Sequence, residues 1–297
     1  MTDTKLKIKY NEICQNLAER KLKPAFDGIE QFITENGVIV HLEDWRKLAE
    51  TYQYMLKYTV EGIQDPERQK IYKRLIVSTF ELADKIYEVV RLKSSSSIEY
   101  DKKRLYVMDP VDNLEGFLNK LEDFYLQEEL MSLVDETEIK GSSEIIDETI
   151  HQQNIVKLFN YLWFQDKLNT NEVELLYGFL TNEIVHDAYK SFVISGLILS
   201  LQRYFDKEKF MLLFDAFNLE NPELSQRAMI GLLINFYKYD ARMPFYSEIT
   251  SRLKILNEDP DFKQNLERVI VQFIRSKETE KIQQKIKDEI IPEMIKI

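Results

Sequence analysis

The sequence contains two matching apolar stretches, VISGLILSL at residues 193–201 and AMIGLLINF at residues 228–236. At the same offset of about 35 residues, Tyr204 aligns with Tyr239 and Phe210 with Phe245. A weaker third copy runs from Leu266 to Ile274. A period of this length is typical of stacked helical arrays, in which each unit buries its apolar faces against its neighbours. Residues from about 182 to 277 are therefore predicted to form stacked helix pairs.

Proline marks several of the predicted helix starts. Asn221-Pro222-Glu223 combines an N-cap residue, a proline at the first helical position and an acidic residue in the first turn. Apolar residues then recur at the helical period as far as Tyr239. The pairs Asp65-Pro66, Asp109-Pro110 and Asp259-Pro260 predict helix starts in the same way. Within the repeat, Gly196 and Gly231 are interpreted as points where a neighbouring helix approaches closely.

The stretch from Asn221 to Ala228, followed by Leu232, Leu233 and Phe236, resembles the second helix of a HEAT repeat. The stretch from His186 to Lys190, with Leu197 and Leu201, is a looser version, and the period is near that of tetratricopeptide repeats. The resemblance implies an all-α, right-handed α-α superhelix, a helical-repeat solenoid of antiparallel helix pairs. It also implies that the second helices line a concave surface. Exposed residues near the ends of those helices would then contact a partner: Gln202, Arg203, Tyr237, Lys238 and Arg242.

The composition excludes several classes of function. Only 8 of the 297 residues are glycine and they are widely spaced, which excludes glycine-rich phosphate loops. The net charge of −11 argues against a general nucleic-acid-binding protein. The single cysteine, Cys14, permits no internal disulfide and is expected to be a buried apolar residue. Without a signal core or a stretch long enough to span a membrane, the chain is expected to be soluble and cytoplasmic.

The sequence predicts two helical blocks, residues 1–93 and 110–297, joined by a polar loop at 94–109 that starts with four serines. They could also form one continuous solenoid. The acidic stretch 135–148 is expected to be a solvated loop, or alternatively a docking site for a basic partner. Because the last residues, 290–297, are mostly apolar, we also expect a longer natural protein or a tail that packs on a partner.

Two Glu-x-x-His pairs, Glu148 with His151 and Glu183 with His186, are the chain's candidate metal ligands. Residues three apart share a helix face, and two such pairs occur in the di-iron sites of ferritin-like bundles. Surface and helix-capping roles are the alternative for these residues. No catalytic signature is found, and no cofactor is expected. The sequence favours a non-enzymatic scaffold for a protein or peptide partner, without nucleic acid or membrane. A di-metal protein and a regulatory helical domain of a larger protein are the alternatives.

Overall fold

The structure is a computed structural model that describes residues 3–61, 67–108, 114–133 and 148–285. Every element in these ranges is a helix, which confirms the predicted all-α class. The chain divides into two compact units, residues 1–247 and 248–297. None of the described helices is both long and apolar enough to cross a membrane.

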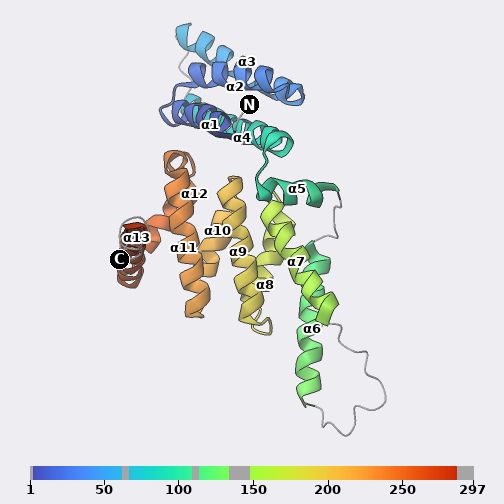
Figure 1. Ribbon diagram of the computed structural model, residues 1–297. Helices are drawn as coiled ribbons and strands as arrows, with labels where there is room; N and C mark the ends of the chain where they lie inside the picture. Colours follow the sequence, from blue (N-terminus) through green and yellow to red (C-terminus); the bar gives the residue numbers. More distant parts are fainter. Residues whose placement is uncertain (1–2, 62–66, 109–113, 134–147, 286–297) are drawn as a thin grey trace, which may run out of the picture. The chain divides into compact units, whose positions relative to one another are not determined.

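The first unit begins with four α-helices that pack on one another. They are α1 (Asp3–Ala18), α2 (Leu22–Asn36), α3 (Leu42–Val60) and α4 (Arg68–Ser94), with the short 3-10 helix η1 (Ile39–His41) between α2 and α3. Helix α1 packs against α2 and α4, and α3 packs against α4 (Figure 1).

The predicted polar loop at 94–109 is wrong, because most of it is helix α5 (Ile98–Met108). The carbonyl of Ser97 accepts hydrogen bonds from the backbone N–H groups of Tyr100 and Asp101, which starts the helix. Tyr100 is fully buried, and Lys103 is 4% exposed. The local composition is polar, but these two side chains reach partners on distant elements, so tertiary contacts stabilise a helix that the polar composition did not predict.

The rest of the first unit includes residues 182–247 of the predicted repeat. Its helices are α6 (Leu114–Leu133), α7 (Glu148–Phe164), α8 (Thr170–Thr181), α9 (Asp187–Arg203), α10 (Lys207–Phe217), α11 (Pro222–Tyr239) and the 3-10 helix η3 (Asp240–Phe245). Helix α9 packs against both α7 and α11, while α10 packs against α8, α9 and α11 (Figure 1). As predicted, Asn221 caps α11, its side chain accepting from the N–H of Glu223 at 2.8 Å. This arrangement is compatible with a helical repeat.

The two glycines of the repeat lie where neighbouring helices approach closely, as predicted. A Cβ atom at Gly196 would lie 2.9 Å from Cβ of Leu162 on α7. A Cβ atom at Gly231 would lie 2.4 Å from Cγ1 of Ile198 on α9. Real Cβ atoms essentially never make contacts this short, so Gly196 permits the close approach of α9 to α7, and Gly231 permits that of α11 to α9.

The second unit holds most of α12 (Ser247–Leu256) and all of α13 (Pro260–Lys285), which starts at the predicted proline. The weaker third copy of the repeat falls on α13, where Ile270, Phe273 and Ile274 are about half exposed. The acidic stretch 135–147 and the apolar residues 290–297 lie outside the described residues, so the interpretations given to them stay predictions.

Replacing Gly231 with alanine should destabilise the protein by about 1–3 kcal/mol, because the new methyl group would overlap Ile198. Gly178 on α8 is the matched control, since a Cβ atom there would meet nothing within 4 Å. Gly178→Ala should instead stabilise the protein by roughly 0.5–1 kcal/mol through helix propensity. Urea denaturation measures both changes. Equal effects of the two substitutions would contradict the close helix approach at Gly231.

Candidate functional site

Helix α4 carries two buried carboxylates one turn apart, Asp84 and Glu88, each 4% exposed. Each is paired with an arginine from the C-terminal half of the first unit. Asp84 contacts Arg242 of η3, and Glu88 contacts Arg203 at the end of α9. These pairs are the centres of two buried polar clusters. The charged groups of the two pairs bind one another and are not exposed for binding another molecule.

The Asp84 cluster is a two-point ion pair reinforced by a phenol. The two terminal nitrogens of Arg242 each lie 2.6 Å from an oxygen of Asp84. Arg242 also donates to the hydroxyl of Tyr10 at 2.6 Å, and that hydroxyl donates to Asp84. Burial raises the pKa of Tyr10 well above its usual value, although the positive charge of Arg242 opposes the shift. Tyr10 therefore stays a neutral donor to the carboxylate.

The guanidinium of Arg242 is also enclosed by aromatic rings. Its central carbon lies 4.6 Å from the ring centre of Phe80 and 5.3 Å from those of Phe205 and Tyr239. Cys14, which was expected to be simply a buried apolar residue, is half-buried, with its sulfur 3.4 Å from Nη2 of Arg242. Burial raises the pKa of this thiol, with Arg242 opposing the rise.

The Glu88 cluster joins α4, α5, α9 and the chain after α7. Glu88 accepts from Lys103 and from the Tyr100 hydroxyl, each at 2.6 Å, and pairs with Arg203. Lys103 and Arg203 also contact Asp166. Burial raises the pKa of Asp166, but the positive charges of Arg203 and Lys103 outweigh burial and leave it below its usual value. Two carboxylates and two cations thus balance within this cluster.

Lys209 on α10 is a fully buried cation beside this cluster. Its Nζ donates to the carbonyl oxygens of Gln165 and Asp166, at 2.5 and 3.0 Å, and to Oγ of Ser200 at 2.8 Å. Burial lowers the pKa of Lys209 to about 7, with the charge of Asp206 opposing that shift. All three acceptors belong to the chain itself, so Lys209 acts as an internal connection between α10 and the end of α7.

The structure divides the five residues that were predicted to contact a partner. The expectation that Arg203 and Arg242 are exposed is wrong, because they are 5% and 3% exposed and pair with the α4 carboxylates. Gln202 is half-buried and donates to Oδ1 of Asn235 at 2.7 Å. Lys238 is exposed and donates to the carbonyl of Gln202. Tyr237 is the most accessible of the five, at 90% exposed.

Tyr237 belongs to an exposed surface that we call the α9–α11 face. Its apolar members are Phe192 and Leu199 on α9, and Ile230 and Tyr237 on α11, all of them exposed. Each pair is seven residues apart and therefore shares one side of its helix. The two helices are joined by hydrogen bonds from Arg227 to Ser195, at 3.0 Å, and from Asn221 to Asp187, at 2.6 Å.

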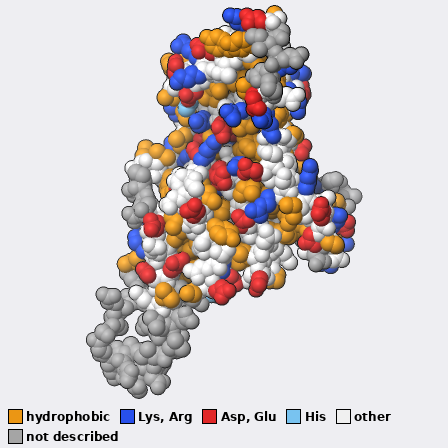
Figure 2. Space-filling model, turned by 180° about the vertical axis from the view of Figure 1, so that it is seen from behind, with side chains coloured by type: hydrophobic (Ala, Val, Ile, Leu, Met, Phe, Trp, Pro, Cys, Tyr) orange, Lys and Arg blue, Asp and Glu red, His pale blue; other side chains and the backbone are white. Residues whose placement is uncertain are grey.

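On the face of the molecule in Figure 2, the described basic and acidic side chains do not form separate patches. Hydrophobic, basic and acidic side chains are interspersed over the described residues shown there. A nucleic-acid-binding surface usually shows a continuous basic patch or stripe instead.

The candidate metal ligands have other partners in the structure. His151 stacks on Phe124 and shares a 2.7 Å hydrogen bond with the Tyr189 hydroxyl. His186 accepts from the N–H of Ala188 and so caps α9, as one alternative predicted. Glu183 is exposed, and the side chain of Glu148 lies outside the described residues. No cluster of three or more possible ligands occurs in the part of the chain that the structure describes. A di-metal site therefore stays a prediction that depends on Glu148.

Sequence analysis did not identify the acidic and lysine members of the buried clusters. Asp84 and Glu88 continue a helical row from Phe80 at four-residue spacing, and this row faces the interior. Carboxylates within an otherwise apolar row were the available signal. Their arginine partners lie 115 and 158 residues away, so the pairing could not be assigned from spacing.

Comparison with known proteins finds no matching family model, no matching curated protein and no matching solved structure.

Replacing Asp84 with asparagine should destabilise the protein by about 3–5 kcal/mol, because Arg242 would remain buried without a full counter-charge. The double variant Asp84→Leu with Arg242→Met should lose less than the sum of the two single changes. Urea denaturation measures each free energy of unfolding. Lys23→Gln, which breaks an exposed pair with Asp27, is the control and should change stability little. Additive losses in the double variant would contradict a buried, mutually dependent pair.

Lys209 should make the protein more stable as pH rises from about 7 to about 9. Its pKa is about 7 when folded against 10.5 for an ordinary lysine, so in this range the unfolded chain binds more protons than the folded chain. Urea denaturation at several pH values, compared with Lys209→Met, isolates this contribution. The variant should show a smaller increase with pH, and equal slopes would contradict the lowered pKa.

Proposed function

We propose that this protein is a non-enzymatic helical scaffold that binds a protein partner through the α9–α11 face. The observation that carries the proposal is the exposure of four large apolar side chains on two adjacent helices, with Tyr237 at 90%. Large exposed apolar groups that gather on one surface are a common mark of a binding site. Tyrosine is also enriched among the residues that contribute most to binding energy.

The arrangement of helices supports a solenoid-like scaffold. Helices α7, α9 and α11 pack side by side in chain order, and α10 packs against both α9 and α11. The close approaches at Gly196 and Gly231 repeat one contact between successive helices of this row. Such a row presents a broad surface for a partner. The right-handed superhelix implied by the HEAT resemblance is part of this proposal.

The buried clusters support a non-enzymatic role. Arg203, Arg242 and Lys209 donate to carboxylates, carbonyls and hydroxyls of this same chain. Groups whose donors are already used internally are poorly placed to bind or activate a substrate. These clusters hold the helices in place, and the surface over them is left for binding.

The partner that fits the α9–α11 face best is an amphipathic helix. Two adjacent helices that each expose apolar side chains seven residues apart form ridges against which a third helix can pack. Such a partner would offer apolar residues at i, i+3, i+4 and i+7. Gln202, Tyr237 and Lys238 lie at the end of this face and would contact the end of the partner helix.

Affinity purification from the native cell with the tagged protein tests the proposal. Tyr237→Asp and Leu199→Asp each place a charge on the face without disturbing a buried group, and each should reduce capture of a specific partner by about tenfold or more. Val60→Asp is the matched control, because Val60 is 87% exposed at the end of α3, away from α9 and α11. It should leave capture unchanged. Equal capture by all variants would remove the α9–α11 face from the proposal.

A further inference from the structure

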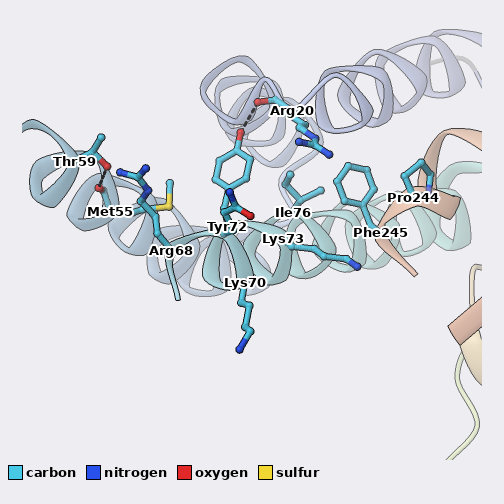
Figure 3. Close-up of a pocket in the computed structure, with 11 residues that line it drawn as sticks. Arg20, Met55, Thr59, Arg68, Lys70, Tyr72, Lys73, Ile76, Pro244 and Phe245 are labelled. Carbon is cyan, nitrogen blue, oxygen red and sulfur yellow. Dashed lines mark hydrogen bonds between the residues drawn. The ribbon is translucent and has the colours of Figure 1, made fainter. Parts of the chain in front are cut away.

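The first unit contains a pocket of about 560 Å³ between its N-terminal helices and η3 (Figure 3). The lining comes from Arg20 in the turn after α1, the last turns of α3, the first turns of α4 and the end of η3. Pockets of this volume suit small organic molecules. The pocket shares no lining residue with the α9–α11 face.

Three of the cations that line this pocket form no ion pair with a carboxylate of the described residues. They are Arg20, Arg68 and Lys73, and no acidic residue is among the lining residues. Within the described part of the chain, none of the three forms an ion pair, whereas the neighbouring Lys21, Lys23 and Lys70 each do. The lining of this pocket contains basic but no acidic residues, although the chain has a net charge of −11, and a positively charged lining suits an anion.

A fourth basic residue, Lys70, lies at the rim and differs from these three. Its Nζ is 2.9 Å from Oε1 of Glu67. Its side chain and that of Tyr72 extend from opposite sides of α4 (Figure 3). Lys70 thus provides a cation of the same helix that is already neutralised.

Arg20 has a backbone conformation that its own side chain does not favour. Its φ angle is 60°, in the left-handed region, which is unfavourable for a residue other than glycine or asparagine. The Tyr72 hydroxyl holds this turn by donating to the Arg20 carbonyl at 2.5 Å. Glycine would adopt this conformation at lower energy, so the turn itself gives no reason for an arginine at this position. The guanidinium points toward Ile76 and Phe245 at the pocket (Figure 3).

The other walls of the pocket are largely apolar. Met55 and Ile76 contribute aliphatic groups, Pro244 and Phe245 contribute rings from η3, and Tyr72 adds a further ring. Met55 and Tyr72 are half-buried, and Phe245 is 7% exposed. A ligand that fills this space therefore needs both an anionic part and a flat or apolar part.

We propose that this pocket binds a phosphorylated small molecule of nucleotide size. Its phosphate groups lie beside basic side chains of the lining, where Arg20 points toward the pocket, and its ring lies against the apolar wall. Guanidinium groups bind phosphate oxygens through two parallel hydrogen bonds, and a lysine adds a further charge. Binding relieves the repulsion between the three cations, so affinity should fall as salt concentration rises.

Isothermal titration calorimetry with ADP as the probe tests this assignment. Wild-type protein should bind ADP, and Arg68→Gln and Lys73→Gln should each weaken binding by about tenfold or more. Lys70→Gln is the matched control and should change the affinity less than twofold, because its charge is already paired with Glu67. Circular dichroism on each variant shows that the fold is retained. An equal loss in all three variants would show only a general charge effect and overturn the proposal.

Further probes separate the two parts of the ligand. Inorganic pyrophosphate and adenosine should each bind more weakly than ADP, because each lacks one of the two parts. Pyrophosphate binding as tight as ADP would overturn the role of the apolar wall, and no ADP binding at about 1 mM would overturn the site. A phosphopeptide that binds more tightly than ADP would assign the pocket to a protein partner instead. The variants Tyr237→Asp and Leu199→Asp should keep ADP affinity, so this test is independent of the α9–α11 face.

Discussion

Two carboxylates of α4, Asp84 and Glu88, bind two arginines that the chain reaches only after more than 100 further residues. Buried charges are tolerated only where their partners are well placed, because removing a charge from water is unfavourable unless a counter-charge and hydrogen bonds replace that water. Since the two carboxylates are one turn apart, both the rotation and the position of α4 along its axis must suit Arg242 and Arg203 at once. The N-terminal helices and the repeat are therefore held in one register within residues 1–247.

This constraint also determines which surfaces remain for function. The arginines at the end of α9 and in η3 are used inside the protein, and Lys209 donates to main-chain carbonyls and a serine. The exposed residues of the repeat include the four apolar side chains of the α9–α11 face, of which Tyr237 is the most exposed. Three cations that form no ion pair within the described residues, Arg20, Arg68 and Lys73, line the pocket formed by the turn after α1 together with α3, α4 and η3. The proposed partner surface and the proposed anion pocket thus lie on different elements of the same unit and can be tested separately.

The helical period and the capping residues predicted much of the local structure. Asn221-Pro222 starts α11, Asp259-Pro260 precedes α13, and Gly196 and Gly231 lie at close helix contacts as expected. The helix starts depend on residues close together in sequence, where backbone chemistry dictates the outcome, whereas the glycine contacts involve Leu162 and Ile198 on other helices. Helix α5 was missed for the opposite reason. Its composition is polar, and it is held by Tyr100 and Lys103 reaching Glu88 of another helix.

The sequence by itself determined the all-α class, most helix boundaries, the repeat period and the absence of a glycine-rich phosphate loop. Only the tertiary structure decided which charged residues are buried. Arg203 and Lys238 both lie near the ends of predicted repeat helices, yet Arg203 is buried against Glu88 and Asp166 while Lys238 remains exposed. Helical periodicity shows which residues share a side of a helix. It does not show which carboxylates of other helices that side contacts. Because the α4 carboxylates are more than 100 residues away in sequence, the helical pattern cannot show that Arg203 and Arg242 are buried.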